Sequence, residues 1–198
     1  MSALAVEHQP PSDDDWDLLV RFWEETDWQE GLTVEIIKGI VTVAPPPTGN
    51  HSLIAAKLMA CLQPGIPMDW GLHQTLGVVV PSKSGLYIPD LLVAPDAVVK
   101  GAPFIPAAAA ELVVEITSPY NAKHDRVDKA VGYARAGVPF YLLIDAFAPL
   151  GPTLTLHGEP RGDLYRVLQV AKFGEVFHLP APFDVDIDTS LFPTPEDS

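Results

Sequence analysis

The chain has 198 residues and a mass of 21.4 kDa, and 47% of its residues are hydrophobic. This size and composition predict one globular domain with a substantial buried core. No apolar run reaches the roughly 18 residues that a membrane-spanning helix needs, and no signal peptide is recognisable, so we expect a cytoplasmic protein with no membrane partner. Cys61 is the only cysteine, which excludes an intrachain disulfide and a cysteine-based zinc cluster.

The formal net charge of −14 is concentrated at the two ends of the chain. Residues 1–30 carry nine acidic side chains and one arginine, and residues 184–198 carry five acidic side chains and no basic one, so the remainder is nearly neutral. Affinity for phosphates depends on lysine and arginine. Four basic side chains gather on or beside one predicted helix: Lys123, Arg126, Lys129 and Arg135. Two readings stay open, because the acidic ends could be solubilising tails or could compete with an anionic ligand.

The spacing of apolar residues predicts helices and strands along the whole chain. We expect a helix at 13–25, a β-hairpin of strands 32–37 and 40–44, and a second helix that Asn50 caps and that ends near Pro64. Further strands are predicted at 68–80, 86–94, 111–117, 138–145, 153–157, 164–170 and 175–179, the last three as a meander at the edge of the sheet. Residues 95–110 are predicted as a loop with at most one short helix.

These elements predict a single domain over residues 13–190, between a disordered tail at 1–12 and a flexible acidic tail at 191–198. The segment that organises the domain is 111–139. It reads as a strand, a helix over 125–136 closed by Gly137, and a second strand, which together form a crossover unit with parallel strands.

Two carboxylates stand out because they interrupt apolar strands. Asp90 lies at the centre of the predicted strand 86–94, and Glu115 lies within the strand 111–117. A buried carboxylate needs a partner, and a neighbouring lysine, arginine or backbone donor would be sufficient. On adjacent strands the two acids could instead bind Mg²⁺, which prefers oxygen ligands, or serve as the acid and base of a glycosidase. Lys129 is the nearby cation that could favour phosphoryl chemistry, by positioning an attacking water.

An ordered series of residues extends this pattern. It comprises Glu35 with Gly39, His51, Pro89-Asp90, Glu115-x-x-Ser118-Pro119, Asp125-x-x-x-Lys129-x-x-x-Tyr133-x-x-x-Gly137-Val138, Tyr141 and Asp145. The series resembles the Uma family, which belongs to the PD-(D/E)XK nuclease superfamily. The resemblance covers residues 15–190, and its specific part is the segment 89–145.

The resemblance implies an α/β (α+β) restriction-endonuclease-like fold, in which helices flank a mixed central β-sheet. It also implies hydrolysis of phosphodiester bonds in nucleic acid, most simply DNA, with Mg²⁺ or Mn²⁺ as the cofactor. Asp90, Glu115 and the main-chain carbonyl of Ile116 fall on the metal ligands, and Lys129 falls on the lysine that positions water. The implied supporting residues are Glu35, His51, Asp125 and Tyr133.

One position departs from the superfamily pattern. Thr117 stands where the superfamily usually has a lysine, two residues after Glu115, and it cannot supply a positive charge. This favours an alternative in which the fold is kept without catalysis, as a binding or assembly module. Lys129 could also pair simply with Asp125 across one helical turn. A homodimer is expected from symmetry and analogy alone.

Overall fold

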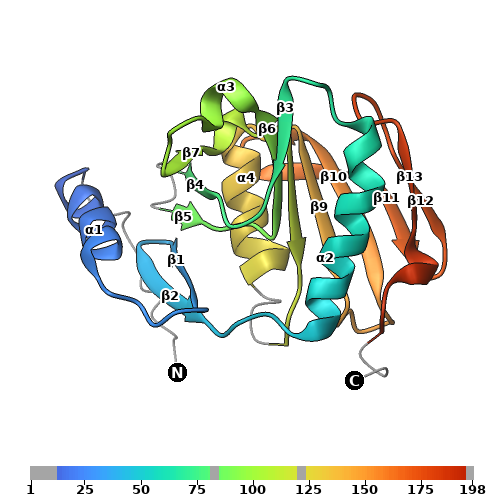
Figure 1. Cartoon of the computed structure of the whole chain (residues 1–198), viewed down its shortest axis with the longest axis horizontal. Coiled ribbons are helices and arrows are strands. Elements are labelled where there is room, and N and C mark those ends of the chain that lie inside the picture. The colour runs from blue at the N-terminus through green and yellow to red at the C-terminus, as the bar shows by residue number, and fades with distance from the viewer. Residues whose placement is uncertain (1–12, 81–84, 120–123, 195–198) are drawn as a thin grey trace, which may run out of the picture.

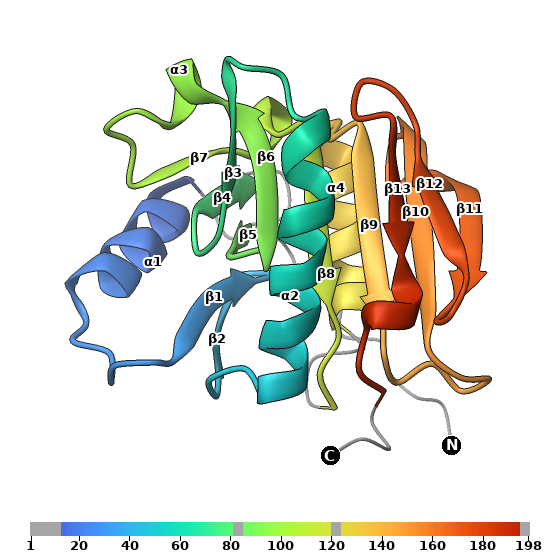
Figure 2. The same ribbon diagram turned by 45° about the vertical axis from the view of Figure 1, so that its right-hand side comes forward.

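The computed structural model describes residues 13–80, 85–119 and 124–194. Within them the chain forms two mixed β-sheets with helices packed around them (Figures 1 and 2). The α-helices are α1 (Asp13–Glu25), α2 (Gly49–Leu62), α3 (Asp96–Val99) and α4 (Ala130–Ala136). None of the helices in the described part of the chain is long and apolar enough to cross a membrane.

The larger sheet has six strands in the order β11-β10-β9-β8-β6-β3. The strands are β3 (Trp70–His73), β6 (Leu91–Pro95), β8 (Leu112–Ile116), β9 (Phe140–Asp145), β10 (Thr153–Arg161) and β11 (Leu164–Lys172). Strands β8 and β9 are parallel and the other neighbouring pairs are antiparallel. The predicted crossover is therefore confirmed, since α4 lies between β8 and β9 in the chain.

The smaller sheet has five strands in the order β2-β1-β5-β4-β7. They are β1 (Thr33–Ile37), β2 (Ile40–Ala44), β4 (Gly77–Val80), β5 (Gly85–Tyr87) and β7 (Phe104–Pro106). The expected hairpin of β1 and β2 is present. Strand β7 lies in the region expected to be a loop, where it pairs with β4 in parallel.

Two predicted strands are wrong in the same way. The run 68–80 breaks into β3 and β4, and the run 86–94 breaks into β5 and β6, with the two halves of each run in different sheets. The first break contains Thr75, whose φ is +59°. The second contains Pro89, which has no N–H to give to a ladder. Asp90 consequently lies in the link between the two sheets rather than at the centre of a strand.

The six-stranded sheet has a hydrophobic core on each face. Leu112, Val114 and Ile116 of β8 face α2 and the separate hairpin of β12 (Val176–Leu179) and β13 (Val185–Asp188). Val113 faces the other way, toward α4 and the smaller sheet. This confirms the two-residue alternation predicted for the strand. It also corrects the predicted meander, because β12 pairs with β13 and does not continue the sheet from β11.

Local details differ from the prediction at the beginnings of the two central helices. Thr48 caps α2, by accepting a hydrogen bond from the backbone N–H of His51, so Asn50 is not the cap. The second helix begins as a π-helix, η4 (His124–Lys129), before α4, and Gly137 ends α4 with a φ of +81° as expected.

The domain boundaries stay a prediction. Packing continues past residue 190, because Phe192 is 5% exposed and belongs to the core beneath α2. Asn50 also donates a hydrogen bond to the carbonyl oxygen of Thr194. The expected tail at 1–12, residues 195–198 and Lys123 lie outside the described residues.

Candidate active site

The predicted site residues meet where the two sheets adjoin. Glu35 lies in β1 of the smaller sheet, Glu115 lies in β8 of the larger sheet, and Asp90 lies in the link that connects β5 to β6. Four more predicted residues come from the helices beside this junction: His51, Asp125, Lys129 and Tyr133. Five of these side chains contact one another around Lys129, and the pair of Asp90 and His51 is joined to them through the backbone of Ile116, next to Glu115, so sequence positions almost 100 residues apart form one cluster.

Lys129 is the centre of the cluster. Its side chain is 3% exposed, and its ammonium lies 2.8 Å from Glu35 Oε1, 3.1 Å from the carboxylate of Glu115 and 3.5 Å from Asp125 Oδ1. Tyr133 donates a hydrogen bond of 2.6 Å to Glu115 Oε1, and the backbone N–H of Ile88 donates one of 2.7 Å to Glu35 Oε1. Lys129 is therefore much more than the partner of Asp125 across one helical turn.

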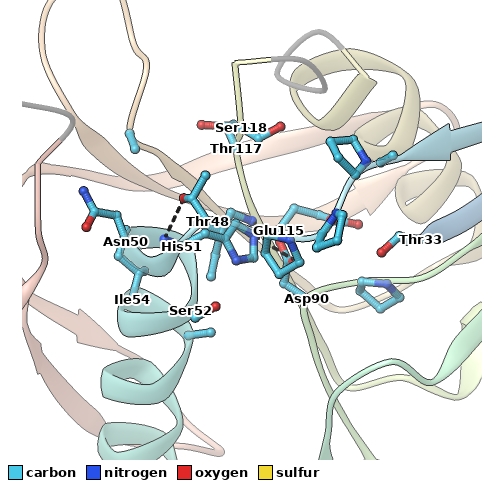
Figure 3. Close-up of a pocket in the computed structure, with 18 of the residues that line it drawn as sticks. Thr33, Thr48, Asn50, His51, Ser52, Ile54, Asp90, Glu115, Thr117 and Ser118 are labelled. Carbon is cyan, nitrogen blue, oxygen red and sulfur yellow. Dashed lines mark hydrogen bonds and ion pairs between the residues drawn. The ribbon is translucent and has the colours of Figure 1, made fainter. Parts of the chain in front are cut away.

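Asp90 and His51 form the more accessible half of the cluster. Asp90 Oδ2 accepts a 2.6 Å hydrogen bond from the backbone N–H of Ile116, and His51 Nε2 lies 3.1 Å from Asp90 Oδ1. Figure 3 shows the two side chains facing each other beside the first turn of α2. The bond to Ile116 ties the link before β6 to the end of β8, so the backbone fixes the place of Asp90 next to Glu115.

The pKa of His51 is raised above its usual value by this environment. Burial by itself would lower the pKa, but the hydrogen bond and charge of Asp90, the charge of Asp125 and a hydrogen bond with the backbone of Ile116 outweigh burial. His51 thus lies against Asp90, one of the groups that the family resemblance assigns to a metal.

The carboxylates outnumber the positive charges in this buried cluster. Burial raises the pKa of Glu115 well above its usual value, Lys129 opposes the rise, and Asp125, Asp90 and Glu35 reinforce it. Burial likewise raises the pKa of Asp125 to about 7. Burial would lower the pKa of Lys129, but its carboxylate neighbours raise it well above the usual value, so the ammonium stays charged.

A second polar network surrounds Thr117. The hydroxyl of Thr117 donates a 3.1 Å hydrogen bond to Asp145 Oδ1, and Arg126 donates two hydrogen bonds to the same carboxylate, at 2.6 and 2.7 Å. Arg126 also donates to the carbonyl of Phe147. Sequence reasoning did not connect these side chains. The sequence could have indicated this contact, because Thr117 directly follows β8 and Asp145 ends β9. The two strands are parallel, so their carboxyl ends lie side by side.

A groove with a volume of about 1070 Å³ lies over the cluster. Its walls come from the β1–β2 hairpin, the prolines at 45–47, the first turns of α2, the link at 88–90, the end of β8 and the segment 193–194. Figure 3 shows Thr33 on one side of the groove and Asn50 and Ser52 on the other. Lys129 and all of the predicted acids except Asp125 contribute to its lining.

The donor set fits a divalent cation by its chemistry. With every carboxylate ionised and His51 neutral, four carboxylates against one ammonium would give a formal charge of −3, and the raised pKa values of Glu115 and Asp125 show that protons offset part of it. Carboxylate and carbonyl oxygens are the ligands that Mg²⁺ prefers. Both carboxylate oxygens of Asp125 are buried without a hydrogen bond. In the described residues of this conformation, no three His, Cys, Asp or Glu side chains are arranged around a common metal position.

Comparison with known proteins identifies the family of the chain. A family model whose description is "putative restriction endonuclease" matches residues 23–191. The chain belongs to this family, Uma2. The family resemblance noted in the sequence is thereby confirmed.

The Uma2 chain is also similar to a solved structure of a putative nuclease belonging to DUF820, from Anabaena variabilis. The TM-score is 0.61 and the sequence identity is 18%, over 90% of this chain and 95% of the other. At this identity the similarity establishes the fold, and the predicted restriction-endonuclease-like class is confirmed. No curated protein matches the chain.

Proposed function

We propose that this Uma2 protein is a divalent-metal-dependent nuclease that hydrolyses phosphodiester bonds of nucleic acid at Asp90, Glu115 and Lys129. The observation that carries the proposal is the cluster itself, in which buried carboxylates converge on one lysine at the floor of a groove. A buried net negative charge is costly, and protons or a cation must offset it. Because the chain belongs to a family of putative restriction endonucleases, we expect a metal cation to offset this charge.

Asp90, Glu115 and the main-chain carbonyl of Ile116 would hold Mg²⁺ or Mn²⁺. A bound metal would lower the pKa of a water molecule and stabilise negative charge on the phosphate. Lys129 would orient the attacking water through one of its N–H groups, while Glu35 and Asp125 keep its ammonium in place. Tyr133 would hold Glu115 in one orientation, and His51 would do the same for Asp90. DNA is the expected partner, and a homodimer stays a prediction by analogy.

One observation favours a second candidate, a nuclease fold that binds without cutting. Thr117 is bonded to Asp145 and supplies no charge, and Asp90 and Glu115 both have partners within the protein. In that case the buried carboxylates would be structural. The first candidate predicts metal-dependent cleavage that needs Asp90 and Glu115, and the second predicts no cleavage.

The test is cleavage of plasmid and single-stranded DNA with Mg²⁺, with Mn²⁺ and with a chelator. Asp90→Asn and Glu115→Gln should each abolish cutting, because each variant removes one carboxylate charge without changing the shape of the side chain. The matched control is Glu159→Gln, which removes an exposed carboxylate that pairs with Arg166 far from the groove. Cutting that persists with chelator, or in either site variant, would contradict the proposal. A folded protein that neither cuts nor binds metal would favour the binding module.

A further inference from the structure

The lining of the groove carries information about the substrate. Among the described residues that line the groove, Lys129 is the only lysine or arginine. Its ammonium is buried among three carboxylates and cannot reach a row of phosphates. The other ionisable lining residues are Glu35, Asp90, Glu115 and His51, and His51 is paired with Asp90, so the groove offers few positive charges to a ligand.

Two basic side chains near the groove are paired with acids. Lys38 at the turn of the β1–β2 hairpin pairs with Asp128, and Arg126 beside the end of β8 pairs with Asp145. The described residues that line the groove form no positive stripe. Proteins that bind duplex DNA neutralise several phosphates with lysine and arginine, and this contribution supplies most of their non-specific affinity.

The walls of the groove suit unpaired bases better than a phosphate backbone. They include the prolines at 45–47, Ala56 and Met59, which offer apolar surface, and hydroxyls such as those of Thr33 and Ser52, which offer hydrogen bonds without charge. In a duplex the base faces are stacked on each other and only the base edges are accessible. In a single strand the bases can turn outward and bury their faces against protein.

The volume of the groove also favours a short unpaired segment. A cavity of about 1070 Å³ is at the upper end of the range of roughly 300–1,000 Å³ found for small-molecule sites. A site of this size holds a ligand of small-molecule dimensions, such as one or a few nucleotides. A single strand can bend into such a concave site, whereas a duplex is stiff over about 150 base pairs.

We propose, on the basis of the nuclease function proposed above, that the groove selects a short unpaired segment of nucleic acid and excludes intact duplex. Recognition uses base faces against the apolar walls, with few phosphate contacts. Binding is consequently weakly dependent on salt. Unpaired DNA and RNA share this chemistry, and the experiment below separates them.

The first experiment measures cleavage of one labelled sequence in four forms with Mn²⁺: single-stranded DNA, single-stranded RNA, full duplex, and duplex with an unpaired loop of a few nucleotides. We expect single strands and the loop to be cut at least tenfold faster than the duplex. With about two phosphate contacts, the rate should fall less than tenfold between 50 and 200 mM salt. Equal cutting of duplex, or a fall of about 10³ or more, would overturn the proposal.

The second experiment measures binding of the same four ligands by fluorescence anisotropy, and it does not need catalysis. Tighter binding of single strands than of duplex supports the groove assignment even if nothing is cut, in which case only the nuclease function fails. Duplex binding that equals or exceeds single-strand binding overturns the assignment, whatever the outcome of the cleavage assay.

A pair of variants locates the binding. Ala56→Lys adds a charge to the groove wall, and Ala60→Lys adds the same charge on the same helix at an exposed position outside the groove lining. If the strand lies in the groove, Ala56→Lys should steepen the slope of log K against log salt by about 0.7, and Ala60→Lys should leave it unchanged. Equal slopes for the two variants would exclude the groove.

Discussion

Replacing Lys129 by methionine should destabilise the protein more than any exposed lysine substitution. Methionine keeps most of the volume and removes the ammonium, which leaves Glu35, Glu115 and Asp125 without their common counter-ion. Breaking a buried ion pair by removing one partner costs about 3–5 kcal/mol. In a domain of this size each kcal/mol lowers the melting temperature by about 2–4 °C, so a fall of roughly 10 °C is expected.

The cost should depend on pH, because the remaining carboxylates can take up protons. A carboxylate whose pKa is higher in the folded than in the unfolded state binds more protons when folded, so its contribution to stability falls as pH rises. Burial already raises the pKa of Glu115 and of Asp125, and removal of Lys129 raises them further. The difference in unfolding free energy between variant and wild type should therefore be small at pH 5 and largest at pH 8.

The assay is urea denaturation at pH 5, 7 and 8, with and without Mg²⁺. Lys57→Met serves as the control, because Lys57 is exposed on α2. Mg²⁺ should recover more stability in Lys129→Met than in wild type, since the cation then supplies the missing charge. If Lys129→Met is as stable as wild type at pH 8 without Mg²⁺, the ammonium is not the counter-ion of the cluster.

Three further substitutions probe the surroundings of the cluster. In wild type the raised pKa of Asp125, about 7, should lower the free energy of unfolding by about 3 kcal/mol between pH 4 and pH 7. Asp125→Asn should remove this pH dependence, which denaturation across the range measures. Tyr133→Phe removes a hydrogen bond to Glu115 and should cost about 1.5–3 kcal/mol in urea denaturation, and an unchanged midpoint would contradict the bond. Gly132→Ala places a Cβ 2.6 Å from the ring and hydroxyl of Tyr87, so a loss of about 1–3 kcal/mol is expected in the same assay, whereas a gain would mean that the ring moves freely.

Much of the fold follows from local patterns in the sequence. The alternation in β8 predicts which side chains face α2 and which face α4, because a strand has a period of two residues. Gly137 predicts the end of α4, because the left-handed conformation there suits glycine. Both signals depend only on neighbouring residues, so sequence is sufficient to detect them.

The division into two sheets could not be predicted in this way. Each of the apolar runs 68–80 and 86–94 looks like one strand, and only the partners of its two halves show that they belong to different sheets. Strand pairing depends on residues far away in the chain. The same limit applies to Asp90, whose bond to the N–H of Ile116 depends on the antiparallel register of β6 and β8.

Thr117 and Lys129 show that the positive charge beside Glu115 can come from a neighbouring helix and not from the strand itself. A lysine at position 117 would project from the same face of β8 as Glu115, because the two positions are two residues apart. The structure uses Thr117 instead to bond Asp145, and Lys129 reaches Glu115 from the end of the π-helix η4. A single ammonium thus lies beside the strand acid although the strand itself has no lysine. A search that required the lysine two residues after the acid would reject this chain, while the contacts of Glu115 keep it among the candidates for phosphodiester hydrolysis.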